Sequence, residues 1–112
     1  SILAGPGTGG ITITGNNFSN SRGKLGVRNE KNPFTWDVGS GVLLKSASDV
    51  TISGNFFGKL TTEAVKADDT SSGILVSGNM MTELNQGAQG LKKAIDLGAA
   101  KEVLVKDNLI RD

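Results

Sequence analysis

The chain contains no cysteine and no histidine among its 112 residues. Without cysteine there are no disulfides and no thiolate nucleophiles, so the cysteine content leaves the redox compartment undecided. Without histidine, a Ser-His-Asp triad, a Cys-His pair and histidine-rich zinc sites are excluded within this chain. Any catalysis must therefore use Asp, Glu, Lys, Arg, Ser or Thr.

Aromatic residues and net charge are also low. Aromatic residues make up 4% and hydrophobic residues 37% of the chain, so aliphatic side chains must form most of the core, and the 16 glycines indicate many turns. The net charge of +1 gives no indication of nucleic acid or of an anionic membrane as a partner. No apolar run approaches the roughly 18–20 residues of a membrane span.

One eight-residue pattern occurs four times, as ITITGNNF at 11–18, VTISGNFF at 50–57, ILVSGNMM at 74–81 and VLVKDNLI at 103–110. In each copy, alternating apolar residues lead to a Gly-Asn or Asp-Asn pair, and another apolar residue follows two positions after the asparagine. The aligned asparagines are 39, 24 and 29 residues apart: Asn16, Asn55, Asn79 and Asn108. Such self-similarity is typical of repeat folds.

A second, shorter strand pattern precedes each copy, for example Val42 and Leu44 before Val50. The repeating unit is therefore strand, turn, strand, corner, strand, because alternation with period two predicts strands. The asparagine after each glycine tolerates the left-handed backbone that a sharp corner needs. Such a unit can bury its apolar side only by stacking on its neighbours about 4.8 Å away. We therefore predict an all-β fold, a parallel β-helix of about four coils in a single domain spanning 1–112.

The pattern G-V-x-L…D-V-T-I-S-G-N-x-F at 41–57 resembles the right-handed parallel β-helix repeat of the pectate-lyase-like superfamily. The resemblance covers most of the chain except 19–40. It implies a right-handed β-helix whose four corner asparagines form a hydrogen-bonded ladder. That superfamily includes polysaccharide lyases, hydrolases and epimerases and the tailspikes of bacteriophages, which implies a polysaccharide partner and an extracellular or virion-surface location. The repeated positions are structural, so the resemblance is far more specific for fold than for function.

The inward positions of this register define the expected core. They are Ile11, Ile13, Phe18, Val42, Leu44, Val50, Ile52, Phe57, Val65, Ala67, Ile74, Val76, Met81, Ile95, Leu97, Val103, Val105 and Ile110. Four coils present two open end faces, so we expect the chain to be a piece of a longer helix or to associate with itself. An alternative for part of the fourth unit is a short helix near 88–95.

Residues 19–40 do not follow the repeat and form the expected long excursion between two coils. They contain the single tryptophan of the chain, Trp36, together with Arg28 and other charged residues. Long ordered loops are commonly functional, and an indole among polar groups suits the apolar face of a sugar ring. The alternative is that Trp36 and Phe34 fold down to cover the core.

Charged residues on the first strand of each unit are the candidate site. The register places Leu43, Lys66 and Asp96 in one ladder and Lys45 and Asp68 in the next, with Asp69 at the turn. The candidate catalytic residues are Lys66, Asp68, Asp69 and Asp96, and the candidate substrate-binding residues are Arg28, Trp36 and Lys45.

In this set, a carboxyl group whose pKa is raised by a like-charged neighbour could act as general acid in a polysaccharide hydrolase. The resemblance implies a lyase alternative, in which grouped carboxylates hold calcium and a Lys or Arg takes the proton. The plain alternative is a set of cross-strand charge pairs on a solvated face.

A stripe of outward apolar residues suggests self-association. Phe56, Met80 and Leu109 follow three of the corner asparagines, and Leu75 and Leu104 take the outward position of the preceding strand. A stacked apolar patch of this kind is typical of an interface, and either a homotrimer or a C-terminal segment folded over that side would bury it. The sequence thus leaves two functions open: a polysaccharide-recognising or polysaccharide-degrading β-helix, or a non-catalytic shaft or spacer that forms trimers.

Overall fold

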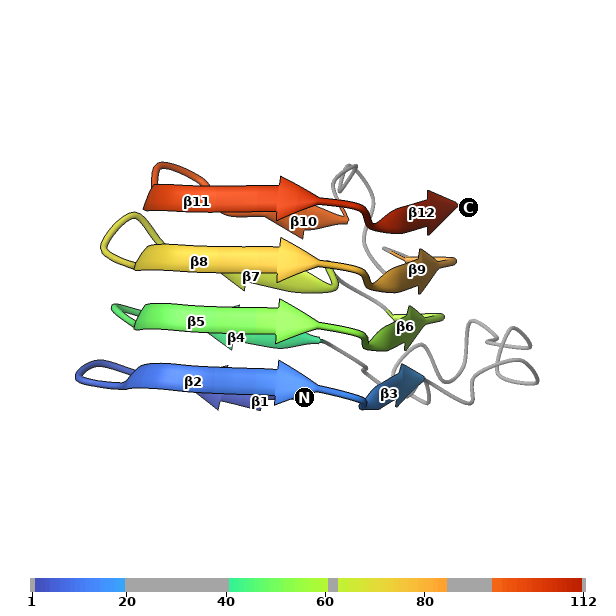
Figure 1. The fold of residues 1–112 in the computed structure, drawn as a ribbon, viewed down its shortest axis with the longest axis horizontal. Coiled ribbons are helices and arrows are strands. Elements are labelled where there is room, and N and C mark those ends of the chain that lie inside the picture. Colours follow the sequence, from blue (N-terminus) through green and yellow to red (C-terminus); the bar gives the residue numbers. More distant parts are fainter. Residues whose placement is uncertain (1, 20–40, 61–62, 85–93, 112) are drawn as a thin grey trace, which may run out of the picture.

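The computed structural model describes residues 2–19, 41–60, 63–84 and 94–111. All regular structure in these ranges is β-strand, and the strands follow one another in groups of three, each group forming one coil of a solenoid (Figure 1). The predicted parallel β-helix of four coils is confirmed. Within the described ranges no helix is long and apolar enough to cross a membrane.

Each coil consists of a short, a long and a short strand. The short first strands are β1 (Ile2–Ala4), β4 (Val42–Leu44), β7 (Val65–Ala67) and β10 (Ile95–Asp96). The long second strands are β2 (Gly9–Thr14), β5 (Ser48–Ser53), β8 (Ser72–Ser77) and β11 (Lys101–Lys106). The third strands are β3 (Asn17–Ser19), β6 (Phe56–Gly58), β9 (Met80–Thr82) and β12 (Leu109–Arg111).

Equivalent strands of successive coils pair in parallel, so the coils build three four-stranded sheets. Their orders are β1-β4-β7-β10, β2-β5-β8-β11 and β3-β6-β9-β12. The register follows the repeat, with Val50 opposite both Ile11 and Ile74 and Phe57 opposite both Phe18 and Met81. The short-helix alternative is wrong for Ile95, which lies in β10, and residues 88–93 lie outside the described ranges.

Alternation along each strand produces the core. On β5, Val50 and Ile52 are buried while Thr51 and Ser53 are half-exposed, because successive side chains point to opposite faces. Inside the third sheet, the Phe18 and Phe57 rings stack with centroids 4.8 Å apart and planes 5° from parallel.

The corner glycines, and not the asparagines, have the left-handed backbone. Gly54 has φ 66° and Gly78 has φ 64°, and in the fourth coil Asp107 takes the same conformation with φ 56°. The expectation that the asparagine provides this conformation is wrong. The asparagine is instead a hydrogen-bonding residue.

The four corner asparagines form the predicted ladder. The backbone N–H and the side-chain Nδ2 of Asn55 donate to Oδ1 of Asn79 at 2.9 and 3.0 Å. The same two donors of Asn79 reach Oδ1 of Asn108 at 3.0 and 2.9 Å, and those of Asn16 reach Oδ1 of Asn55 at 3.0 and 3.2 Å. Asn55 and Asn79 are almost fully buried, 3% and 2% exposed, so the ladder satisfies polar groups that water cannot reach.

In the fourth coil the core prediction holds for Leu97, which is buried, but fails for the second and third strands. Val103, Val105 and Ile110 keep the inward register but are 41%, 45% and 50% exposed. No described residue stacks on the far side of β11 and β12, so these side chains have neighbours on one side of their coil only. Four buried apolar residues lie outside the eight-residue pattern and were not predicted: Ala4, Ala47, Leu60 and Ala64.

Candidate functional site

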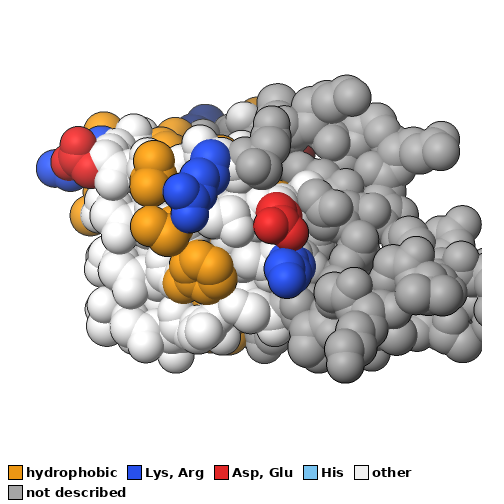
Figure 2. Space-filling model, turned by 90° about the vertical axis from the view of Figure 1, so that its right-hand side faces the viewer, with side chains coloured by type: hydrophobic (Ala, Val, Ile, Leu, Met, Phe, Trp, Pro, Cys, Tyr) orange, Lys and Arg blue, Asp and Glu red, His pale blue; other side chains and the backbone are white. Residues whose placement is uncertain are grey.

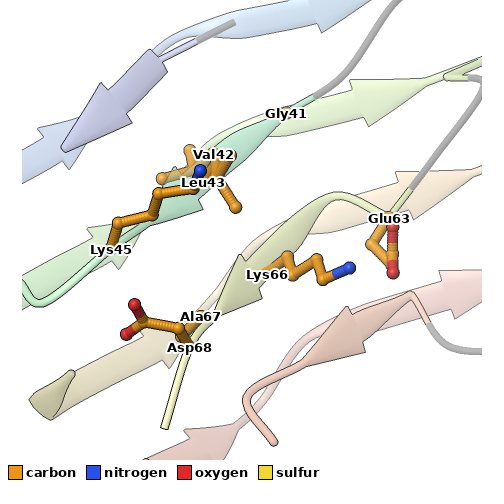
Figure 3. A pocket seen from close by; sticks show the side chains of 8 residues that line it. All are labelled: Gly41, Val42, Leu43, Lys45, Glu63, Lys66, Ala67 and Asp68. Atoms are coloured by element: carbon orange, nitrogen blue, oxygen red, sulfur yellow. The ribbon is translucent and has the colours of Figure 1, made fainter. Parts of the chain in front are cut away.

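A pocket of about 420 Å³ lies on the sheet that contains β4 and β7 (Figure 3). Leu43 and Lys66 are the middle residues of these strands and alternate with buried neighbours, so their side chains face outward. The pocket is lined by Gly41, Val42, Leu43, Lys45, Glu63, Lys66, Ala67 and Asp68. It therefore includes three of the residues predicted for the site, Lys45, Lys66 and Asp68.

The structure brings the candidate residues into the predicted ladders. Lys66 pairs in register with Leu43 on one side and with Asp96 on the other. Lys45 and Asp68 each follow the last residue of their strand, and their N–H groups donate to the preceding coil, to the carbonyls of Ala4 (2.8 Å) and Leu44 (3.0 Å). The two side chains thus occupy equivalent positions one coil apart.

Asp68 is held by its own turn and by the coil before it. Its Oδ1 accepts hydrogen bonds from the backbone N–H of Ser46 at 3.0 Å, from the N–H and hydroxyl of Thr70 at 3.2 and 3.0 Å, and from the hydroxyl of Ser71 at 2.9 Å. The Ser46 N–H has the largest effect and lowers the pKa of Asp68. Desolvation raises this pKa by less, and the Ser71 hydroxyl, the Thr70 hydroxyl and the Thr70 N–H lower it further, so the pKa lies below its ordinary value. Asp68 is therefore a carboxylate at neutral pH and is not a general acid with a raised pKa.

The other two candidate carboxylates also bind backbone groups. Asp69 Oδ1 accepts from the N–H of Ala99 in the next coil at 3.1 Å, and Asp96 Oδ1 accepts from the N–H of Gly98 at 3.1 Å. These bonds join or tighten turns between β7 and β8 and between β10 and β11. In the described parts of the chain, no three His, Cys, Asp or Glu residues are grouped so that they could hold a metal ion such as calcium.

The two lysines remain available to a ligand. Lys45 and Lys66 are exposed, and Figure 3 shows Lys66 extending toward Glu63 while Lys45 runs beside Leu43. Glu63 is 6% exposed and was missed by the sequence reasoning, because it precedes β7 outside the repeated pattern. The pocket thus combines two lysine ammonium groups, an apolar surface formed by Val42, Leu43 and Ala67, and the carboxylates of Glu63 and Asp68.

Two predicted substrate-binding residues cannot be placed. Trp36 and Arg28 lie outside the described residues, as does nearly all of the predicted excursion at 19–40. The alternative that Trp36 and Phe34 cover the core lies there too.

Comparisons with known proteins add no further assignment. No protein-family model, no curated protein and no solved structure matches the chain.

Proposed function

We propose that the chain is a polysaccharide-binding β-helix module whose β4–β7 pocket binds an acidic glycan. The observation that carries this proposal is the pair of exposed lysines, Lys45 and Lys66, on either side of Leu43 in one open pocket. Ammonium groups on long stems attract carboxylate or sulfate groups of a sugar, and the leucine offers an apolar surface to the ring.

Recognition is favoured over cleavage at this pocket by the state of the carboxylates. Asp68, Asp69 and Asp96 each use Oδ1 to accept backbone N–H groups, so they fix the turns beside the pocket. A glycoside hydrolase needs a protonated carboxyl group as general acid, whereas the pKa of Asp68 is lowered.

We also propose that the chain belongs to the pectate-lyase-like superfamily and, for that reason, that it is extracellular or lies on the surface of a virion. Three features support this placement: the three parallel sheets, the corner ladder and the G-N corner of the repeat. Function in such solenoids depends on side chains that the repeat does not specify, so the glycan itself must be found by experiment.

Binding is tested by titrating the whole chain with polygalacturonate, alginate and a neutral glucan in a calorimeter. We expect the acidic polymers to bind and added salt to weaken them, since exposed charges are screened within about 8 Å at 0.15 M ionic strength. A double variant, Lys45→Ala with Lys66→Ala, should bind about 2- to 30-fold more weakly, if each exposed contact contributes about 0.2–1 kcal/mol.

The matched control removes the same charge from another sheet, as Lys101→Ala with Lys106→Ala on β11, where both residues are exposed. This variant should retain the affinity of the original chain. If both double variants bind the acidic polymers equally weakly, the binding depends on the net charge of the chain and not on this pocket. Tighter binding of the neutral glucan than of the acidic polymers would also contradict the proposal.

A second candidate function is the self-associating shaft, and the apolar stripe favours it. Met80, Leu104 and Leu109 are 37%, 53% and 50% exposed, and Leu75 is half-exposed. Figure 2 shows hydrophobic side chains above one another on the side of the molecule that carries β6, β9 and β12. Complete burial of a large apolar side chain stabilises by about 1.5–3 kcal/mol. Because about half of each of these side chains is still exposed, its burial between chains would contribute half of that free energy to association. A closed homotrimer would bury the stripe of each chain equivalently.

Self-association is tested by light scattering over a dilution series. The triple variant Met80→Ser, Leu104→Ser, Leu109→Ser should remain a monomer at concentrations where the original chain forms trimers. Leu3→Ser is the matched control, because Leu3 is 66% exposed and lies on a different sheet. An original chain that stays monomeric at high concentration would exclude this function.

A further inference from the structure

A second recess lies on the outer face of the sheet that contains β3, β6 and β9. Its volume is about 270 Å³, and it is lined by Ser19, Phe56, Gly58, Lys59 and Thr82. This volume is just below the range of about 300–1,000 Å³ that is usual for drug-sized ligands, so it suits a single small ring. The recess is on a different sheet from the β4–β7 pocket and shares no residue with it.

One wall of the recess is the ring of Phe56, which bends along its own strand to cover Gly58. A Cβ atom added to Gly58 would lie 2.7 Å from Cε2 and 3.0 Å from Cζ of Phe56. Because contacts this short do not occur, the ring can take this position only where residue 58 is glycine. Gly58 is consequently buried although it points outward, and Phe56 is half-buried although it belongs to the outward stripe.

Polar groups line the other walls. Gly58 pairs in register with Ser19 on one side and with Thr82 on the other. The Ser19 and Thr82 side chains therefore flank the position where Gly58 has no side chain. The Ser19 hydroxyl donates to Asn17 Oδ1 and remains an acceptor, while the Thr82 hydroxyl has no hydrogen bond to another described residue. Lys59 is exposed, and its N–H donates to the carbonyl of Thr82 at 3.1 Å, which ties its backbone to the next coil.

We infer that this recess is a binding site for a single acidic sugar ring, such as a hexuronate. The apolar face of the pyranose stacks on the exposed part of the Phe56 ring, and its hydroxyls bond to Ser19 and Thr82. Its carboxylate pairs with the ammonium group of Lys59. A flat apolar surface, two hydroxyls and a cation around a ring-sized space are the groups that such a sugar requires.

Glu83 is the charged group that opposes this ligand. It follows Thr82 in the third coil as Lys59 follows Gly58 in the second, so the two residues occupy equivalent positions one coil apart. A carboxylate there repels an acidic sugar. The inference therefore predicts that Glu83→Gln binds the sugar more tightly than the original chain, by about 2- to 5-fold for an exposed pair.

The test is a titration of the full chain with sodium glucuronate, followed by the methyl NMR signals of Met80 and Thr82. Glucose and sodium acetate are titrated separately as the neutral ring and the bare carboxylate. We expect saturable shifts with glucuronate and much weaker binding of both controls. Gly58→Ala should weaken binding about 2- to 10-fold, because the methyl group displaces the Phe56 ring. Gly5→Ala is the matched control, since a Cβ there meets no atom within 4 Å.

Folding of each variant is checked by far-ultraviolet circular dichroism. If Gly58→Ala does not fold, Phe56→Leu replaces it, because leucine keeps the apolar volume and removes the flat ring. In the double variant of Lys45 and Lys66, the Met80 and Thr82 signals should still shift with glucuronate, because neither lysine lines this recess. This result separates the recess from the β4–β7 pocket.

Three results would overturn the inference. The first is unchanged glucuronate affinity in Gly58→Ala or Phe56→Leu. The second is acetate binding as strong as glucuronate binding, which would leave only charge attraction at Lys59. The third is a set of Met80 and Thr82 shifts that follow protein dilution and not sugar, which would show that a second copy of the chain occupies this face.

Discussion

Replacing Asn79 by alanine removes five hydrogen bonds from the corner ladder. Oδ1 of Asn79 accepts the N–H and Nδ2 groups of Asn55, and Nδ2 of Asn79 donates to Oδ1 of Asn108 and to the carbonyls of Ile52 and Ser77. The backbone N–H of residue 79 keeps its bond to Asn108 in the variant. The largest loss of stability comes from the backbone N–H of Asn55, which no longer has an acceptor. Asn55 is only 3% exposed, so water cannot replace that acceptor.

The expected loss of stability follows from these contacts. An orphaned buried N–H costs about 1–3 kcal/mol, and each further lost hydrogen bond costs about 0.5–1.5 kcal/mol. Because Asn55 Nδ2 keeps its bonds to Ile13 and Ser53, we count the bonds to Ile52 and Asn108 as the further losses. The free energy of unfolding should fall by about 2–6 kcal/mol, a large part of the roughly 5–15 kcal/mol of an ordinary domain.

Asn16→Ala is the matched control at the first coil. Asn16 is exposed, and its side chain only donates, to Thr14 at 3.1 Å and to Asn55 Oδ1 at 3.2 Å. Its removal orphans no buried N–H, so we expect a loss of about 1 kcal/mol or less.

Urea unfolding followed by far-ultraviolet circular dichroism measures both variants, with the free energy obtained by linear extrapolation. If Asn79→Ala and Asn16→Ala have the same midpoint and slope, the ladder does not stabilise the coils in the way that its hydrogen bonds indicate.

Three further substitutions test the core, the turn and a close backbone contact. Ile52→Ala should cost about 2–5 kcal/mol because Ile52 is fully buried, whereas Val105→Ala, at a position 45% exposed, should cost far less in the same urea experiment. In Asp68→Asn the stabilising effect of the carboxylate is lost. Since the folded-state pKa is lowered, this effect is fully present above the ordinary value of 3.8 and disappears as the pH falls through the lower folded-state value. The two melting temperatures should therefore converge in acid, and a constant difference down to strongly acidic pH would contradict the assignment. Gly41→Ala should destabilise the chain more than Gly5→Ala in thermal unfolding, because its Cβ would lie 1.9 Å from the carbonyl oxygen of Ala64.

The period-two pattern made the fold predictable. In VTISGNFF, Val50 and Ile52 are the first and third residues, and both can be buried only if these two positions face inward. The same two positions are apolar in all four copies of the pattern. The asparagine ladder followed because equivalent corners stack, which brings Asn55 above Asn16 and below Asn79.

The candidate site was less predictable because it depends on turns and not on strands. The register correctly placed Lys66 beside Asp96, but no pattern in the sequence indicates that Asp68 and Asp69 accept backbone N–H groups from neighbouring coils. The position of the Phe56 ring depends on Gly58, and this Phe-x-Gly signal was present in the sequence but has no copy in the other coils to draw attention to it.

Differences in repeat length are concentrated at one corner of the coil. β6 ends at Gly58 and β7 begins at Val65, whereas β3 ends at Ser19 and β4 begins only at Val42, yet the paired residues of the three sheets keep a common register. The chain thus separates a constant scaffold from a variable segment, and new segments can be exchanged at this corner without changing how the coils stack. For protein engineering, the junction between the third strand and the following first strand is a place to graft a peptide epitope or a binding loop. Successive coils would then display several such grafts in a row, spaced by the distance between neighbouring strands.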